Sequence, residues 1–342
     1  MRRAQKYVHS YGRPGLALLA LNALAGCAAG GGEEQITMVG FAVPAEANAA
    51  VGDAFSQTPE GEGVTYATSY GASGDQSRAV ANGLPGEFVH FSIEPDVTRL
   101  EEAGMVAEDW DEGPSSGMVT DSVVVLVVRE GNPKDITDWE DLIRDDVGIV
   151  TPNPGSSGAA RWNILAAWGS VLQDGGTEDE AAEYMEQMIA NVQAFPGSGR
   201  DATTAFLDGT GDVLLSYENE AILGRQAGED YEYIVPDRNL LIENPAAVTE
   251  DSPQAAQDFL EFALSPEGQQ IYAGYGFRPL RHVADEMEID DVEGAEDPTD
   301  PYPEVETLWT IDDDFGGWDQ VVEDYFDTDG IITEIIEQSG MS

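Results

Sequence analysis

Three short turns rich in glycine and serine are the part of this chain best suited to bind a ligand. They span residues 71–74, 155–159 and 197–200, and each follows an apolar run and opens a stretch with helical character. Glycine lets a backbone approach a ligand closely, and the N–H groups in the first turn of a helix point outward at the positive end of the helix dipole. Each turn could therefore hold a small anion with main-chain donors.

One such turn alone would be an ordinary helix cap, because serine and glycine are common at helix N-termini. Three turns in one chain, none carrying the lysine of a nucleotide-binding P-loop, favour a small anion held by neutral dipoles. A shared ligand requires Ser73, Ser157 and Gly199 to meet in one cleft.

The elements that must position these turns are short apolar runs alternating with amphipathic segments. The runs span residues 35–41, 64–67, 88–91, 123–128, 147–150 and 213–215. This alternation is typical of an α/β fold, in which helices cover a parallel or mixed sheet. Ser252 before Pro253 and Ser265 before Pro266 predict two helix starts. The acidic region 290–302 is expected to be a solvated loop.

The charge balance restricts the partners. The 342 residues include 66 acidic and 15 basic side chains, for a formal net charge of −51, and 42% of residues are hydrophobic. Because the acids are spread along the chain, we expect a folded core under an acidic surface, as in salt-adapted (halophilic) proteins. A nucleic-acid partner is implausible, since phosphate neutralisation needs a basic face.

The N-terminus predicts export and a lipid anchor. A basic start precedes an apolar stretch at residues 15–26, which is short of the ~20 residues of a membrane span. We therefore expect a signal peptide at residues 1–26 and a flexible tether at 27–34. Cys27, the only cysteine, follows Leu-Ala-Gly as in a lipobox, so its thiol is predicted to carry a lipid. This would hold the protein at the outer, extracytoplasmic face of the cytoplasmic membrane, whether export uses the Sec or the twin-arginine route.

Several motifs, in matching order and spacing, resemble the periplasmic sulfate-binding protein family (sulfate/thiosulfate ABC transporter substrate-binding proteins). They lie at residues 70–76, 129–134, 151–163, 165–169, 211–220, 265–269 and 315–318. The resemblance covers the chain from about Gln35 to the C-terminus.

The resemblance implies an α/β, two-lobed type II periplasmic-binding-protein fold with a ligand cleft between the lobes. Lobe one is expected at 35–117 plus 220–301 and lobe two at 118–219, with residues 302–342 bridging both. Hinges are expected near 120–128 and near Tyr217.

The same resemblance implies the binding residues. The hydroxyl and amides of Ser157, Gly158 and Ala159 would clamp one side of the anion, opposite Ser73. Further amides would come from Ala42 and Gly199. Tyr217 stands where the family has a tryptophan, so a phenolic O–H would replace an indole N–H. Arg161 is expected to brace the Ser157 turn without touching the ligand.

The implied function is that of a monomeric solute-binding lipoprotein, without cofactor or metal, that captures sulfate for an ABC-type importer. Its partners would be the permease and the ATPase. Thiosulfate, molybdate and tungstate stay open as ligands, as does anion sensing without transport. Sulfate carries no proton at pH 7, so a pocket without a carboxylate would reject hydrogen phosphate by setting donor against donor. Asp75 and Asp201, next to two of the turns, are the carboxylates that could overturn this selectivity.

An enzyme is the main rival class. Beyond the signal segment the chain has only His90 and His282, no Gly-x-Ser-x-Gly elbow, and no base evident beside Ser73 or Ser157. A calcium loop at 327–330 is excluded as an EF-hand, because Tyr325 and Ile336 occupy its first and last ligand positions.

Overall fold

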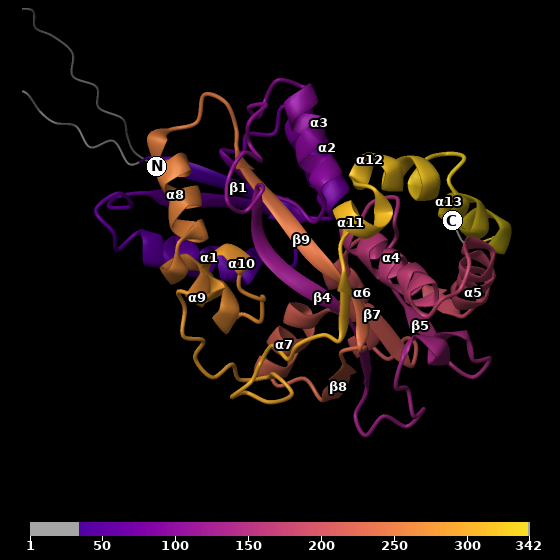
Figure 1. Ribbon diagram of the computed structural model, residues 1–342. Coiled ribbons are helices and arrows are strands. Elements are labelled where there is room, and N and C mark those ends of the chain that lie inside the picture. The colour runs from indigo at the N-terminus through magenta and orange to yellow at the C-terminus, as the bar shows by residue number, and fades with distance from the viewer. Residues whose placement is uncertain (1–33, 341–342) are drawn as a thin grey trace, which may run out of the picture. The chain divides into compact units, whose positions relative to one another are not determined.

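The computed structural model describes residues 34–340, which form a ten-stranded mixed sheet with helices packed around it (Figure 1). The strands are β1 (Gln35–Phe41), β2 (Thr65–Gly71), β3 (Phe88–His90), β4 (Met118–Arg129), β5 (Ile149–Val150), β6 (Val192–Ala194), β7 (Val213–Tyr217), β8 (Tyr231–Ile234), β9 (Arg238–Val248) and β10 (Thr307–Trp309). The predicted α/β class is confirmed.

Thirteen α-helices accompany these strands in the described part of the chain. They are α1 (Ala45–Phe55), α2 (Ser73–Ala81), α3 (Glu94–Glu102), α4 (Gly158–Gln173), α5 (Glu178–Ala190), α6 (Gly199–Leu207), α7 (Glu218–Gln226), α8 (Gln254–Leu264), α9 (Pro266–Gly274), α10 (Arg281–Ala284), α11 (Ile311–Phe315), α12 (Trp318–Val321) and α13 (Ile331–Ser339). A 3₁₀ turn spans Trp139–Ile143, and a π turn spans Val322–Phe326.

The sheet has two halves joined by two long strands. In the first half β1 pairs in parallel with β2 and β3, and β3 runs antiparallel to the end of β9. In the second half β5 pairs in parallel with β6 and β7, while β7 and β8 run antiparallel to the C-terminal part of β4.

Strands β4 and β9 pair with each other through the middle of the sheet and belong to both halves (Figure 1). Strand β4 carries an apolar run buried on both faces, as a central strand requires. Strand β9 is thus a second crossing between the halves, and the hinge near Tyr217 stays a prediction. The exact division into lobes at residues 117 and 219 stays a prediction.

The direction of the strands explains why the predicted turns can meet. Phe41 at the end of β1 is in register with Gly71 at the end of β2, so the chain leaves both strands at one edge. In the second half Val150 of β5 is in register with Leu214 of β7. Ligands of open α/β sheets bind beyond the carboxyl ends of their strands. Helices α2, α4, α6 and α7 each begin close to such an end.

The C-terminal segment packs against elements of both halves. Strand β10 pairs with the start of β9. The ring of Trp318 meets Trp162 edge-on with centroids 4.9 Å apart, and Tyr325 meets Trp168 at 5.2 Å. Helix α12 contacts α3, and α13 contacts α5. Figure 1 shows these yellow helices beside α4 and α5.

The two predicted helix starts were accurate to within a residue. Ser265 caps α9 by accepting a hydrogen bond from the Gly268 N–H, with Pro266 at the first helical position, as predicted. Helix α8 starts one residue later than expected, with Pro253 as its cap. Region 290–302 contains no helix or strand, in agreement with the expected loop, but it is anchored by the buried residues Val292 and Ala295.

Residues 1–33 and 341–342 lie outside the described part of the chain. The predicted signal peptide, nearly all of the predicted tether and the lipidation at Cys27 fall there. Between residues 34 and 340, no helix combines the length and the apolar character needed to cross a membrane.

Candidate functional site

The turn at Ser157 presents its donors at the start of α4. Ser157 is the N-cap and is buried, yet its side chain makes no capping hydrogen bond, while its own N–H donates to the Asn153 carbonyl at 2.9 Å. Gly158 and Ala159 are the first two residues of the helix, so their N–H groups have no intrahelical acceptor. The turn therefore directs a hydroxyl and two amides toward the same region.

The turn at Ser73 touches the Ser157 turn directly. The Gly74 N–H donates to the Ser156 carbonyl at 3.2 Å. The Ser73 hydroxyl donates to Asp96 Oδ2 at 2.6 Å and accepts the Ser92 N–H at 2.9 Å. Because this hydroxyl proton is already used, the donor that Ser73 can offer a ligand is its main-chain N–H at the first position of α2.

The third turn lies against the same place. The Ser156 hydroxyl donates to the Gly197 carbonyl at 2.8 Å, which ties the second and third turns together. A β-carbon built on Gly199 would lie 3.5 Å from Ala159 Cβ and 3.4 Å from Val43 Cγ2. The structure thus brings Ser73, Ser157 and Gly199 together at the carboxyl ends of the strands.

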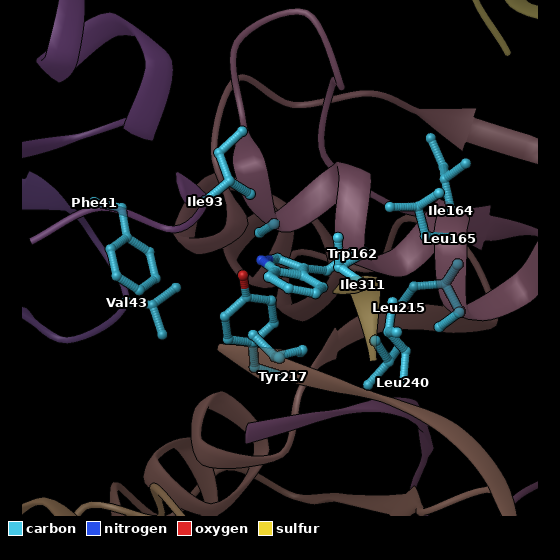
Figure 2. Close-up of a cluster of buried hydrophobic side chains, with 14 of the residues drawn as sticks. Phe41, Val43, Ile93, Trp162, Ile164, Leu165, Leu215, Tyr217, Leu240 and Ile311 are labelled. Carbon is cyan, nitrogen blue, oxygen red and sulfur yellow. The ribbon is translucent and has the colours of Figure 1, made fainter. Parts of the chain in front are cut away.

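Tyr217 ends β7 and is buried among these turns. Its hydroxyl lies 2.7 Å from Ser92 Oγ, and the Ser92 carbonyl accepts the indole N–H of Trp162 at 2.7 Å. Figure 2 shows the Tyr217 hydroxyl and the Trp162 indole nitrogen close together, with Ile93 nearby. Burial raises the pKa of Tyr217, so its phenol stays a neutral donor.

Ala42 is the predicted site residue whose donor is already engaged. It follows β1, and its N–H donates to the Gly71 carbonyl at 3.0 Å. Ala42 lies beside the site, because the next residue, Val43, faces Gly199. Ala42 therefore lies next to the predicted anion site, but its N–H is not available to donate to an anion in this structure.

The arginines nearest the turns are held by other groups. Arg161 Nε donates to the Pro154 carbonyl at 3.3 Å, and its guanidinium lies 4.9 Å from the centre of the Phe326 ring. It thereby links the Ser157 turn to the C-terminal segment. Arg200 lies 2.9 Å from Glu220 Oε1, in an ion pair without hydrogen-bond geometry, and 3.5 Å from Glu46 Oε1.

The carboxylates near the site are also satisfied. Asp75 pairs with Arg78 at 2.6 Å on the surface, and Asp201 Oδ2 accepts the Ser198 hydroxyl at 2.8 Å within the cap of α6. Sequence reasoning missed Asp96, which is buried and binds Ser73 and, at 2.7 Å, Arg99.

Sequence reasoning also missed Ser92, which joins most of these groups. Beyond its contacts with Ser73, Tyr217 and Trp162, its carbonyl accepts the Asn244 amide at 2.9 Å. A signal was present, because the apolar run 88–91 is followed by Ser92 and then by Pro95 near the start of α3. This is a fourth strand–turn–helix junction without the glycines that marked the other three.

Comparisons with known proteins identify the family of this chain. The family described as "Bacterial extracellular solute-binding protein" matches residues 36–278. The chain is 38% identical to the sulfate-binding protein of Synechococcus elongatus, covering 86% of this chain and 85% of that one. It is 33% identical to the thiosulfate-binding protein of Escherichia coli K12, over 81% of this chain and 82% of that one.

Among solved structures, the sulfate-binding protein SubI from Mycobacterium tuberculosis H37Rv superimposes with a TM-score of 0.79 at 42% identity, over 86% of this chain and all of that one. Solute-binding proteins of this kind are not enzymes, and they share a two-lobed fold. The chain belongs to the periplasmic sulfate-binding protein family and has its type II periplasmic-binding-protein fold.

Proposed function

We propose that this protein captures sulfate outside the cytoplasm and delivers it to an ABC-type importer. The observation that carries the proposal is the convergence of the first turns of α2, α4 and α6 on one place beside Tyr217. Each of these helix starts offers main-chain N–H groups and the positive end of its dipole. A small dianion matches this donor set.

Six donors are available. They are the hydroxyl of Ser157, the amides of Gly158, Ala159, Ser73 and Gly199, and a hydroxyl from the Ser92–Tyr217 pair. Two hydroxyls that share one hydrogen bond keep a second proton for another acceptor. Hydrogen bonds to charged groups contribute about 1.5–3 kcal/mol each, so six can exceed the ~8 kcal/mol of a micromolar complex after association costs.

The same geometry supports selection against phosphate. Hydrogen phosphate must donate its proton to an acceptor, but Asp96 already accepts from Ser73 and Arg99. Asp75 and Asp201 are held by Arg78 and Ser198. A phosphate proton would therefore find no free carboxylate to accept it, at a cost of about 1–3 kcal/mol for each group left unsatisfied.

Thiosulfate is the second candidate ligand. Thiosulfate-binding proteins are relatives at 33% identity, and thiosulfate shares the tetrahedral shape of sulfate. By the resemblance, Tyr217 stands where the family has a tryptophan, so a phenolic O–H would replace an indole N–H at the anion. Molybdate and tungstate are larger tetrahedral anions. Measuring how well thiosulfate, molybdate and tungstate each displace bound sulfate would rank the affinities of the four anions.

The proposal includes a lipid anchor at Cys27 and two protein partners, the permease and the ATPase of the importer. A lipidated Cys27 would hold the protein on the membrane beside its permease and ATPase. Changing Cys27 to Ser should release the protein into the medium. Retention of this variant on membranes would contradict the predicted lipid anchor. If deletion of the anchored protein leaves sulfate uptake by the cell unchanged, anion sensing without transport is favoured.

Calorimetry tests the ligand. At about 1 M chloride the Debye length is ~3 Å, which confines repulsion from the net charge of −51 to near neighbours. We expect saturable one-to-one binding of sulfate and at least a hundredfold weaker binding of phosphate. Equal affinity for the two anions would contradict the proposed donor-only site.

A further inference from the structure

One polar cavity in the described part of the chain has a lining that includes none of the predicted anion-binding residues. It has a volume of about 430 Å³ and is bordered by α3, by the paired strands β4 and β9 and by the C-terminal segment. Five carboxylates line it, together with one arginine and one histidine: Glu94, Asp111, Asp121, Glu243, Asp312, Arg281 and His282. The five carboxylates outnumber the basic side chains in this lining. We call this cavity the acidic pocket.

Two of these carboxylates oppose each other on the strands that join the halves of the sheet. Asp121 of β4 and Glu243 of β9 are direct partners in the antiparallel register. Like charges at directly opposed positions destabilise a strand pair. Most neighbouring residues of β4 and β9 are apolar, so two opposed carboxylates are unusual at this place. A positively charged group beside them would remove the repulsion between them.

Arg281 and Arg278 act on Asp121 from a distance, but no basic side chain of the described residues lies within the 4 Å of an ion pair with it. The Asp121 side chain is only 5% exposed, and its Oδ1 atom has no hydrogen-bond partner among the residues the structure describes. Arg278, on the neighbouring segment, is occupied by Glu218, with two contacts of 2.6 and 3.0 Å. A buried carboxylate without compensation costs several kcal/mol, so either a proton or a bound cation has to neutralise it.

The protonation of the pocket agrees with missing positive charge. Burial and Glu243 raise the pKa of Asp121 well above its usual value despite Arg281 and Arg278. Burial, followed by the neighbouring carboxylates, raises the pKa of Glu94 to about 7, and burial with Asp312 raises the pKa of Glu243.

We propose that the acidic pocket binds a hydrated divalent cation, with Mg²⁺ as the reference ion. Between residues 34 and 340, no three acidic or histidine side chains are placed to ligate one ion directly, so the ion keeps water in its coordination shell. Mg²⁺ favours this mode, with one or two carboxylates and several waters. Six waters need about 180 Å³ at ~30 Å³ each, which the cavity accommodates.

The position of the ion gives it a structural consequence. It would neutralise Asp121 and Glu243 on the two strands shared by both halves, and would draw Glu94 of α3 and Asp312 of α11 toward them. The inference concerns this pocket alone and does not depend on which anion the protein carries.

The test is a titration of the full chain with MgCl₂ at constant ionic strength, followed by calorimetry and thermal unfolding. The parent should show one saturable site and a rise in Tm. Asp121→Asn should have a higher Tm than the parent without Mg²⁺, because the cost of burying this carboxyl is removed, and should bind Mg²⁺ at least tenfold more weakly. Glu243→Gln should likewise have a higher Tm without Mg²⁺ and a weaker Mg²⁺ affinity. This second variant tests the proposal if Asp121→Asn does not fold.

The matched control is the double variant Glu60→Gln/Glu62→Gln, which removes two exposed carboxylates elsewhere. It should keep the parent's Mg²⁺ affinity. An equal Mg²⁺ response in the parent and in Asp121→Asn, or no saturable binding in the parent, would overturn the proposal and leave only general screening of the acidic surface.

Discussion

The hydroxyls of Ser92 and Tyr217 lie 2.7 Å apart, although 125 residues separate them in the chain. Ser92 follows β3 in the first half of the sheet, and Tyr217 ends β7 in the second. The same serine accepts the Trp162 indole through its carbonyl. One contact thus connects the two halves at the place where the predicted anion-binding turns meet, and it makes the hydroxyl of Tyr217 the most direct target for mutation.

Tyr217→Phe removes that hydroxyl and keeps the ring. If the Ser92–Tyr217 pair donates to the anion, the loss of a charge-assisted bond should cost about 1.5–3 kcal/mol, which raises the sulfate Kd at least tenfold. Calorimetry measures the change. Tyr66→Phe, which deletes a hydroxyl bonded to Ser56 and the Gly52 carbonyl, is the control and should leave the Kd unaltered. Parent-like affinity in Tyr217→Phe would assign this side chain to packing alone.

Gly158→Ala should weaken sulfate binding far more than Gly199→Ala. A β-carbon on Gly158 would lie 2.7 Å from both Ser92 Cβ and Ser92 Oγ and 3.0 Å from Ile93 Cγ2, whereas one on Gly199 meets only ordinary contacts. The first variant forces the turn after β3 away from α4, so a rise in Kd of at least tenfold is expected for it. Similar Kd values for the two variants would contradict this packing argument.

Arg200→Gln should destabilise the folded protein by about 1–3 kcal/mol, because it leaves the buried carboxylate of Glu220 without its counter-charge. Urea unfolding measures the loss. The double variant Arg200→Gln/Glu220→Gln removes both charges and should recover most of the stability. A double variant less stable than the single one would show that the arginine acts through packing.

The pH dependence of stability should contain a contribution from Glu94. Its folded pKa of about 7 lies above its unfolded value, so the folded state binds the extra proton. Stability from this group is therefore complete below about pH 4.5 and is lost as pH rises through 7. The facing charges are those of Asp111, Glu243, Asp312 and Asp319.

Glu94→Gln should flatten the decline in Tm between pH 5 and pH 8 in Mg²⁺-free buffer at fixed salt. Glu60→Gln, at an exposed position, is the control and should keep the parent's slope. Parallel curves for Glu94→Gln and the parent would rule out this carboxyl as the titrating group.

The sequence alone determined the features that depend on neighbouring residues. Strand β1 was predicted with its exact bounds at 35–41, the cap at Ser265 was correct, and helices begin at Gly158 and Gly199 just after the serines of two predicted turns. Apolar periodicity and N-capping act within a few residues, so they can be recognised without knowing the fold. The family motifs lie on these same local elements.

Only the tertiary structure decided which donors remain available and which charges oppose each other. The Ser73 hydroxyl is used by Asp96, and the Ala42 amide by Gly71, because strand ends from different parts of the chain lie side by side. Strand β9 was missed, since a proline within an apolar run argues against a central strand. The opposition of Asp121 to Glu243 follows from sheet register, which is set by long-range burial that no local window of sequence contains.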